Sequence, residues 1–210
     1  MNKGVVSVLV AYLIWGVYPV YFHAMQHVAP AEIVLHLVLW TFALLAVYFI
    51  CSRRWRWIQK AVTDRRTVAV FLMSSVLITA NWSTYTYAIV TNQTLEASLG
   101  YFMNPLVSVL LGTVFLKEKL NKAQMLAIVF ACAGVMWVTF KQGEFPALGL
   151  TLALSFGFYG LVRKMAPLGS LEGLTLETAF AFPVALLATF YFAGNGDLTF
   201  VHGTSWDKFW

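Results

Sequence analysis

The sequence predicts an all-α membrane protein, a polytopic bundle of transmembrane helices. Two observations carry this prediction. The composition is 60 % hydrophobic and only 11 % charged, whereas roughly a quarter of the residues in a soluble domain are charged. The apolar residues also come in long runs, and a helix needs about 20 such residues to cross roughly 30 Å of hydrocarbon. The net charge of +5 does not indicate nucleic-acid binding, because the charges gather in short loops between these runs.

Seven apolar runs are long enough to be membrane spans. They cover about residues 4–23, 31–51, 68–90, 95–116, 123–140, 147–164 and 173–193. We expect all of them to be helices, because backbone groups in lipid must be hydrogen-bonded within their own segment. The first run is too long for the core of a signal peptide and has no cleavage site, so we expect it to stay as a span. The loops between runs leave no room for a soluble domain.

The basic residues predict the orientation of the chain. If the amino terminus is cytoplasmic, twelve of the fourteen Lys and Arg residues fall on the cytoplasmic side, and only Lys141 and Lys208 fall outside. The most basic loop, residues 53–66, is expected to anchor the topology at the lipid headgroups, and a specific lipid-binding role is the alternative. We therefore predict a multi-pass protein with a cytoplasmic amino terminus.

Two matched positions indicate a faint internal repeat. The pair at 15–16, Trp-Gly, matches the pair at 159–160, Tyr-Gly, 144 residues later, and Glu32 matches Glu177, 145 residues later. The copies are offset by five spans. Because this number is odd, one copy is inverted in the membrane, an arrangement that holds substrate near the midplane.

This division predicts a five-helix repeat over residues 1–143 and an incomplete second repeat of two helices over residues 144–210. A complete protein of this design has five plus five spans. Residues 207–210 resemble the approach to an eighth span. We therefore expect a truncated chain, or one whose remaining helices come from a homodimer or another partner.

Aromatic and polar side chains within the expected spans predict a substrate path. Aromatic faces with a few Asn, Tyr and His groups suit an organic ligand that is flat, amphipathic or cationic. Ordinary aromatic packing and interfacial anchoring is the alternative for part of the set. The candidate substrate-binding residues are Trp15, Tyr18, His36, Trp40, Asn81, Trp82, Tyr85, Tyr101, Asn104 and Tyr159.

Three ionisable residues are candidates for proton coupling, namely Glu32, His36 and Glu96. An ionisable group inside a membrane costs about 3 kcal/mol on insertion scales, so it usually faces a cavity or a partner. Histidine also titrates near neutral pH. The alternative is that Glu32 is interfacial and that His36 hydrogen-bonds a neighbouring helix.

The run at 95–116 carries a ridge of small and polar residues. The ridge repeats every four residues and consists of Glu96, Gly100, Asn104, Ser108 and Gly112. Small residues let helices approach closely, so the ridge indicates either a tight helix contact or a flexible helix beside the transport path. Pro19, Pro105 and Pro183 are expected to kink the helices that contain them.

No metal, cofactor or enzymatic chemistry is expected. Cys51 and Cys132 lie in different runs without metal-ligand spacing. The chain has no H-E-x-x-H, no G-x-S-x-G and no phosphate-binding loop, and its intramembrane polar residues are scattered. A membrane enzyme is therefore disfavoured, and a non-transporting receptor or assembly factor is the stronger alternative to a transporter.

Four stretches resemble the EamA branch of the drug/metabolite transporter superfamily. They are AYLIWGVYPVYF (11–22), EIVLH (32–36), LEASLGYFMNPL (95–106) and SFGFYGLVRK (155–164). The resemblance covers essentially the whole chain. It implies ten helices in two inverted repeats, a bacterial inner-membrane location, and export of small organic solutes or drugs by alternating access. Leu37 stands where this pattern has an arginine.

Overall fold

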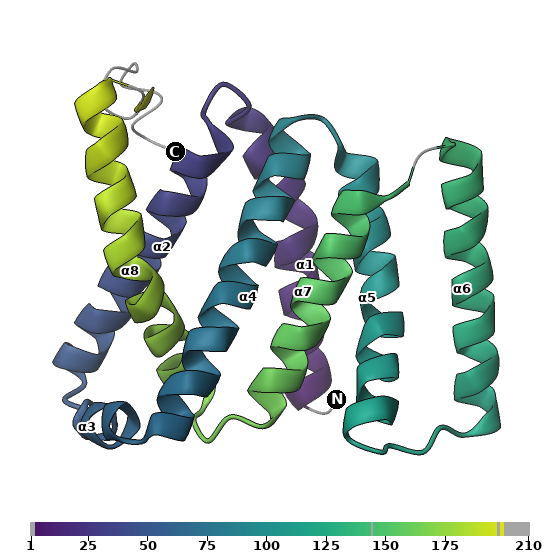
Figure 1. Cartoon of the computed structure of the whole chain (residues 1–210), viewed down its shortest axis with the longest axis horizontal. Coiled ribbons are helices and arrows are strands. Elements are labelled where there is room, and N and C mark those ends of the chain that lie inside the picture. Colours follow the sequence, from purple (N-terminus) through teal and green to yellow (C-terminus); the bar gives the residue numbers. More distant parts are fainter. Residues whose placement is uncertain (1–2, 144, 197, 200–210) are drawn as a thin grey trace.

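The computed structural model describes residues 3–143, 145–196 and 198–199, and the regular structure within them is helical. The helices are α1 (Lys3–Ala24), α2 (Pro30–Cys51), α3 (Arg56–Thr63), α4 (Arg65–Val90), α5 (Thr94–Phe115), α6 (Lys122–Gln142), α7 (Ala147–Lys164) and α8 (Ser170–Asn195). All but the short α3 run along the bundle in alternating directions, and α1 lies behind α4 and α7 in the view of Figure 1. The predicted all-α polytopic bundle is confirmed, while the expected approach to an eighth span at 207–210 lies outside the described residues.

The number of spans differs from the prediction. Six described helices are long and apolar enough to cross a membrane, namely α1, α2, α4, α5, α6 and α8. The expected span at 147–164 forms α7, which has only 18 residues and ends in Arg163 and Lys164. The prediction of seven spans is therefore wrong by one, because these two charges lower the apolar character of a helix that is already short. Since α7 packs against both α4 and α5, neighbouring helices surround much of it.

The basic loop also contains a helix that the sequence analysis did not predict. The eight-residue α3 lies across one end of the bundle, nearly perpendicular to the long helices (Figure 1). It is followed at once by α4, whose first turn is capped by Asp64: the carboxylate accepts hydrogen bonds from the backbone N–H groups of Arg66 (3.3 Å) and Thr67 (3.1 Å). This cap fixes the point at which the chain turns from the bundle end into α4.

Glycines bring α5 and α7 into close contact. A Cβ added to Gly100 would lie 2.8 Å from the Cβ of Leu152, and one added to Gly149 would lie 2.9 Å from the backbone oxygen of Glu96. Close approach at Gly100 agrees with the predicted ridge of small residues. The contact places α7 firmly beside α5, and α4 lies on its other side.

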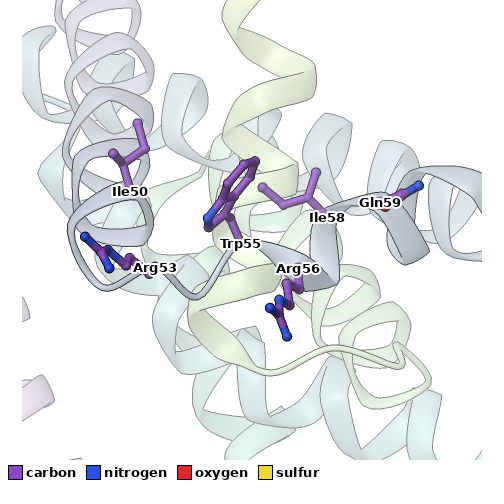
Figure 2. A pocket seen from close by; sticks show the side chains of 6 residues that line it. All are labelled: Ile50, Arg53, Trp55, Arg56, Ile58 and Gln59. Carbon is purple, nitrogen blue, oxygen red and sulfur yellow. The ribbon is translucent and has the colours of Figure 1, made fainter.

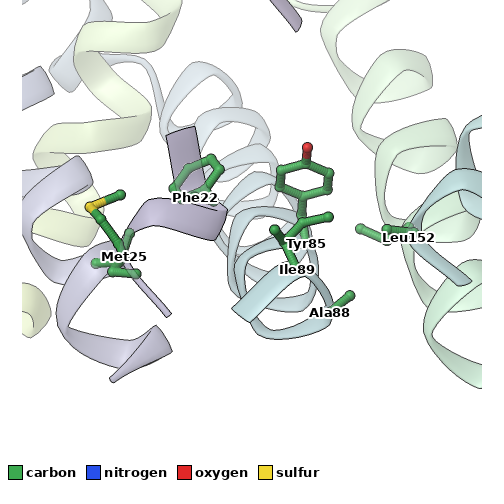
Figure 3. Close-up of a cluster of buried hydrophobic side chains, with 8 residues drawn as sticks. Phe22, Met25, Tyr85, Ala88, Ile89 and Leu152 are labelled. Carbon is green, nitrogen blue, oxygen red and sulfur yellow. The ribbon is translucent and has the colours of Figure 1, made fainter. Parts of the chain in front are cut away.

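A cluster of buried side chains joins α1, α4 and α7 near one end of the bundle. Its labelled members in Figure 3 are Phe22, Met25, Tyr85, Ala88, Ile89 and Leu152. The cluster holds the carboxyl-terminal part of α1 against α4. By contrast, α6 packs only on α5 among its principal contacts, and large side chains such as Phe130 (69 % exposed) and Trp137 (67 % exposed) cover its surface. A helix that is apolar on its exposed sides faces lipid.

Three prolines lie inside helices as expected, Pro19 in α1, Pro105 in α5 and Pro183 in α8. Proline has no backbone N–H and therefore cannot donate to the carbonyl four residues earlier in the helix. Two of the carbonyls that lose this donor belong to Trp15 and Tyr101, both of which are candidate substrate residues.

Candidate substrate cavity

A cavity of about 260 Å³ lies between α1, α4 and α5. It is lined by Tyr12, Trp15, Gly16, Pro19, Tyr85, Ile89, Thr94, Ala97, Ser98 and Tyr101. Three of the predicted substrate residues, Trp15, Tyr85 and Tyr101, are therefore brought together here from three different helices.

Simple helical spacing explains why these residues share one space. The lining residues of α1 fall at positions 12, 15, 16 and 19, and those of α5 at positions 94, 97, 98 and 101. Both sets follow the i, i+3, i+4, i+7 pattern of a single helix face. Tyr85 and Ile89 of α4 are one turn apart and close the space between the two faces. The cavity thus has one wall from each of three adjacent helices.

Aromatic rings dominate the lining. The rings of Tyr85 and Tyr101 meet edge to face with centroids 5.8 Å apart, and those of Tyr12 and Trp15 do the same at 5.6 Å. Trp15 also contacts Phe156 of α7 at 6.4 Å. Tyr85 is buried, at 8 % exposed, whereas Tyr12, Trp15 and Tyr101 are at least 40 % exposed. The cavity therefore has a closed inner wall at Tyr85 and an accessible outer rim of aromatic rings.

Sequence reasoning missed the polar part of the lining. Thr94 and Ser98 are cavity residues, but no prediction included them. Their spacing with Tyr101 along the same helix face was the available signal.

Seven predicted substrate residues lie outside this cavity. They are Tyr18, His36, Trp40, Asn81, Trp82, Asn104 and Tyr159. Trp40 is 61 % exposed on α2. Asn81 joins two helices, since its amide nitrogen donates to the Leu152 carbonyl (3.1 Å) and to the Ser155 hydroxyl (3.0 Å) of α7. The side-chain oxygen of Asn104 is buried and has no hydrogen-bond partner among the described residues.

A second polar constellation lies where α4, α7 and α8 meet, and it centres on Glu177. Glu177 is 1 % exposed. One of its carboxylate oxygens accepts a hydrogen bond from the Ser74 hydroxyl (2.7 Å), and the other accepts one from the Tyr159 hydroxyl (3.3 Å). The backbone oxygen of Glu177 accepts a further bond from Ser75 (2.6 Å). The buried carboxylate thus joins α8 to α4 and α7.

Arg163 of α7 supplies the balancing charge. Its Nε lies 3.6 Å from a carboxylate oxygen of Glu177, and its guanidinium lies over the ring of Phe71, 5.3 Å from the centroid. Gly173 leaves room for this group, because a Cβ there would lie 1.7 Å from Nη1 of Arg163. Sequence reasoning used Glu177 only as a repeat match and Arg163 only for topology, although an ionisable residue inside a span was itself a signal of a partner.

Two of the proton-coupling candidates accept hydrogen bonds from backbone groups. An oxygen of Glu96 accepts from the N–H of Leu148, in the first turn of α7, at 3.0 Å. An oxygen of the buried Glu32 accepts from the N–H of Thr199, also at 3.0 Å. His36 is partly buried on α2. A carboxylate at a helix amino terminus interacts favourably with the unpaired N–H groups there, so Glu96 stabilises the start of α7 in this state of the protein.

Within residues 3–143, 145–196 and 198–199, no three His, Cys, Asp or Glu side chains gather in a way that could hold a metal ion. Cys51 is exposed, Cys132 is partly buried, and neither forms a disulfide.

The long apolar helices define a multi-pass membrane protein, and its bundle contains an aromatic cavity between α1, α4 and α5. The family model of EamA-like transporters matches residues 2–140. The chain therefore belongs to the EamA-like transporter family, and the resemblance found in its sequence is confirmed.

Curated relatives agree with this assignment. The chain is 40 % identical to the uncharacterized transporter YojE of Bacillus subtilis over 188 residues, which cover 88 % of this chain and 63 % of the relative. It is 39 % identical to protein RarD of Salmonella typhi over 194 residues, covering 92 % of this chain and 66 % of the relative. RarD of Escherichia coli is 38 % identical over 194 residues, with the same coverage. The chain thus spans about two thirds of the length of these relatives. No solved structure matches it.

Proposed function

We propose that this chain is a non-enzymatic transporter that exports small organic solutes across a bacterial inner membrane. The observation that carries the proposal is the cavity between α1, α4 and α5, whose walls present Trp15, Tyr85 and Tyr101. Membership of a family of transporters supports a solute as the ligand of this cavity.

The size and lining of the cavity favour a compact solute. Its volume of about 260 Å³ is below the roughly 300–1,000 Å³ of sites for drug-sized ligands. No carboxylate and no basic residue is among its lining residues, so binding relies on aromatic faces and hydroxyl groups. Such a site suits a flat, amphipathic or cationic molecule.

The prolines beside the cavity support a role in both binding and movement. Pro19 and Pro105 have no backbone N–H group, so they cannot donate a hydrogen bond to the carbonyls of Trp15 and Tyr101. These carbonyls are then acceptors for donor groups of a solute. A helix that lacks one internal hydrogen bond also bends there at lower cost. We propose that α1 and α5 bend at these points during alternating access.

We propose proton coupling through Glu32, His36 and Glu96, with a cytoplasmic amino terminus. The orientation is supported by the strong bias of basic residues to one side. The coupling is supported by the position of these groups on helices α2 and α5, because ionisable side chains within membrane helices are rare and often belong to proton relays. We also propose that a second copy of this chain, or another partner, supplies additional helices. Chemical cross-linking in membranes would test this.

Chloramphenicol is a suitable probe, because it is a compact nitroaromatic amphiphile and a relative 29 % identical to this chain, from Pseudomonas aeruginosa, is named chloramphenicol-sensitive protein RarD. The purified full chain would be reconstituted in liposomes, and binding and flux of radiolabelled chloramphenicol would be measured. Loss of one aromatic contact costs about 0.5–1.5 kcal/mol, so Trp15→Ala and Tyr101→Ala should each weaken binding about two- to twelvefold.

Trp137→Ala is the matched control, since it also removes a large ring but from the lipid-facing α6. It should leave binding and flux unchanged. If Trp15→Ala and Trp137→Ala weaken chloramphenicol binding equally, then the cavity is not the binding site. Binding without flux would instead identify a non-transporting receptor, and chemically altered chloramphenicol would identify an enzyme. Under an imposed pH gradient, unchanged flux in Glu32→Gln, His36→Gln and Glu96→Gln would rule out the proton coupling.

A further inference from the structure

We propose that the junction of α2 and α3 is a binding site for the headgroup of one anionic phospholipid. A cavity of about 920 Å³ lies there, lined by Ile50, Arg53, Trp55, Arg56, Ile58 and Gln59 (Figure 2). It belongs to other helices than the aromatic cavity, so this inference does not depend on the proposed transport function.

The local fold holds the site at the end of the bundle, where lipid headgroups lie. The chain leaves α2 through Arg53, which adopts a left-handed backbone conformation (φ 53°), and this turn directs it across the bundle end. α3 then packs its apolar face, through Trp57 and Ala61, onto a buried cluster with Phe71 and Leu176. A short amphipathic helix fixed in this way lies in the plane of the membrane surface.

The charge of the segment matches a phosphate. Residues 52–66 contain six basic residues and a single acidic one, Asp64. That carboxylate is engaged with the first turn of α4, so it does not neutralise the arginines of the cavity. In the described part of the chain, the guanidinium groups of Arg53 and Arg56 have neither an ion pair nor a hydrogen bond. Arginine presents several donors in one plane and binds phosphate oxygens in pairs.

The apolar part of the lining distinguishes a lipid from a free phosphate. In Figure 2 the ring of Trp55 and the side chains of Ile50 and Ile58 point to one side, and the side chain of Arg56 points to the other. Trp55 is 61 % exposed, and an exposed indole at a helix end is typical of the membrane interface. Apolar groups beside two arginines suit a molecule that carries a phosphate and acyl chains together.

Native mass spectrometry of the purified full chain in a neutral detergent would test this site with phosphatidylglycerol, using phosphatidylcholine as the zwitterionic reference. The site variant is Arg53→Asn combined with Arg56→Gln, since asparagine tolerates the left-handed backbone at position 53. The control is Arg54→Gln combined with Lys60→Gln, which removes the same number of charges from the same segment but from residues outside the cavity. Charge-assisted hydrogen bonds from arginine to phosphate are about twice as strong as neutral ones, so a variant that loses two arginine contacts should bind phosphatidylglycerol about tenfold more weakly or worse.

The control variant should lose less than about twofold, because Arg54 and Lys60 do not line the cavity and charges without a direct contact are screened by solvent and salt. Equal losses in the two variants would overturn the site in favour of diffuse surface attraction, and no loss in the site variant would overturn it outright. Trp55→Ala, which keeps every charge, should also weaken phosphatidylglycerol binding. If glycerol phosphate without acyl chains binds as well as the lipid, and Trp55→Ala has no effect, then the ligand is a free organophosphate and the lipid proposal fails.

Discussion

Replacing Gly149 with alanine should destabilise the protein by overpacking the contact between α5 and α7. The added Cβ would lie 2.9 Å from the backbone oxygen of Glu96 and 3.2 Å from the backbone nitrogen of Gly100. Because both are backbone atoms, no side-chain rotation relieves the contact, and the helices must move apart. Overpacking of this kind lowers the free energy of unfolding by about 1–3 kcal/mol.

Gly160→Ala provides the comparison within the same helix, because a Cβ at Gly160 would meet nothing within 4 Å. Both variants gain the same helix propensity, about 0.5–1 kcal/mol, so the difference between them isolates the cost of the contact. Thermal and denaturant unfolding of the two purified variants in one detergent, followed by circular dichroism, would measure it. If Gly149→Ala proves as stable as Gly160→Ala, the two backbones do not approach as closely as described.

Three further predictions concern the polar contacts. Glu177→Gln leaves Arg163 without its buried counter-charge and should lower the free energy of unfolding by about 3–5 kcal/mol. The double variant with Arg163→Met should lose less than the sum of the two single losses. Additive losses in this double-mutant cycle would argue against a direct pair. Asn81→Leu removes two hydrogen bonds to α7 and should lower the unfolding free energy by about 1 kcal/mol, whereas an unchanged value would show that these bonds do not hold α4 to α7. The Thr67 hydroxyl and the backbone N–H groups that bond to Asp64 hold the pKa of this carboxyl below its usual 3.8, so its cap on α4 is present at neutral pH and is lost only as the pH falls below that value. The stability difference between wild type and Asp64→Ala should therefore persist down to about pH 4, and its disappearance at a clearly higher pH would contradict the assigned cap.

The fold was largely predictable, because the length and apolarity of a membrane span are local properties of the sequence. The exceptions are also local. α7 is shorter and less apolar than its neighbours, and α3 is a two-turn amphipathic helix that resembles a basic loop when only its charges are counted.

The sites were only partly predictable. Trp15, Tyr85 and Tyr101 stood out as aromatic residues in different spans, but their spacing does not say which helix faces converge. For the same reason Thr94 was missed, although it lies on the same face of α5 as Tyr101, about two helical turns earlier in the chain. The pairing of Arg163 on α7 with Glu177 on α8 depends on how the two helices pack, and this cannot be inferred from residue spacing along either helix.

The marginal apolarity of α7 has a consequence for the biogenesis of the protein. α7 is the shortest of the long helices, and Arg163 in its last turn is balanced by Glu177 of α8, a residue that is synthesised later. We expect α7 and α8 to integrate as a hairpin, with the carboxylate of the second helix cancelling the charge of the first. The short loop between them, residues 165–169, then determines how soon during synthesis this neutral pair can form.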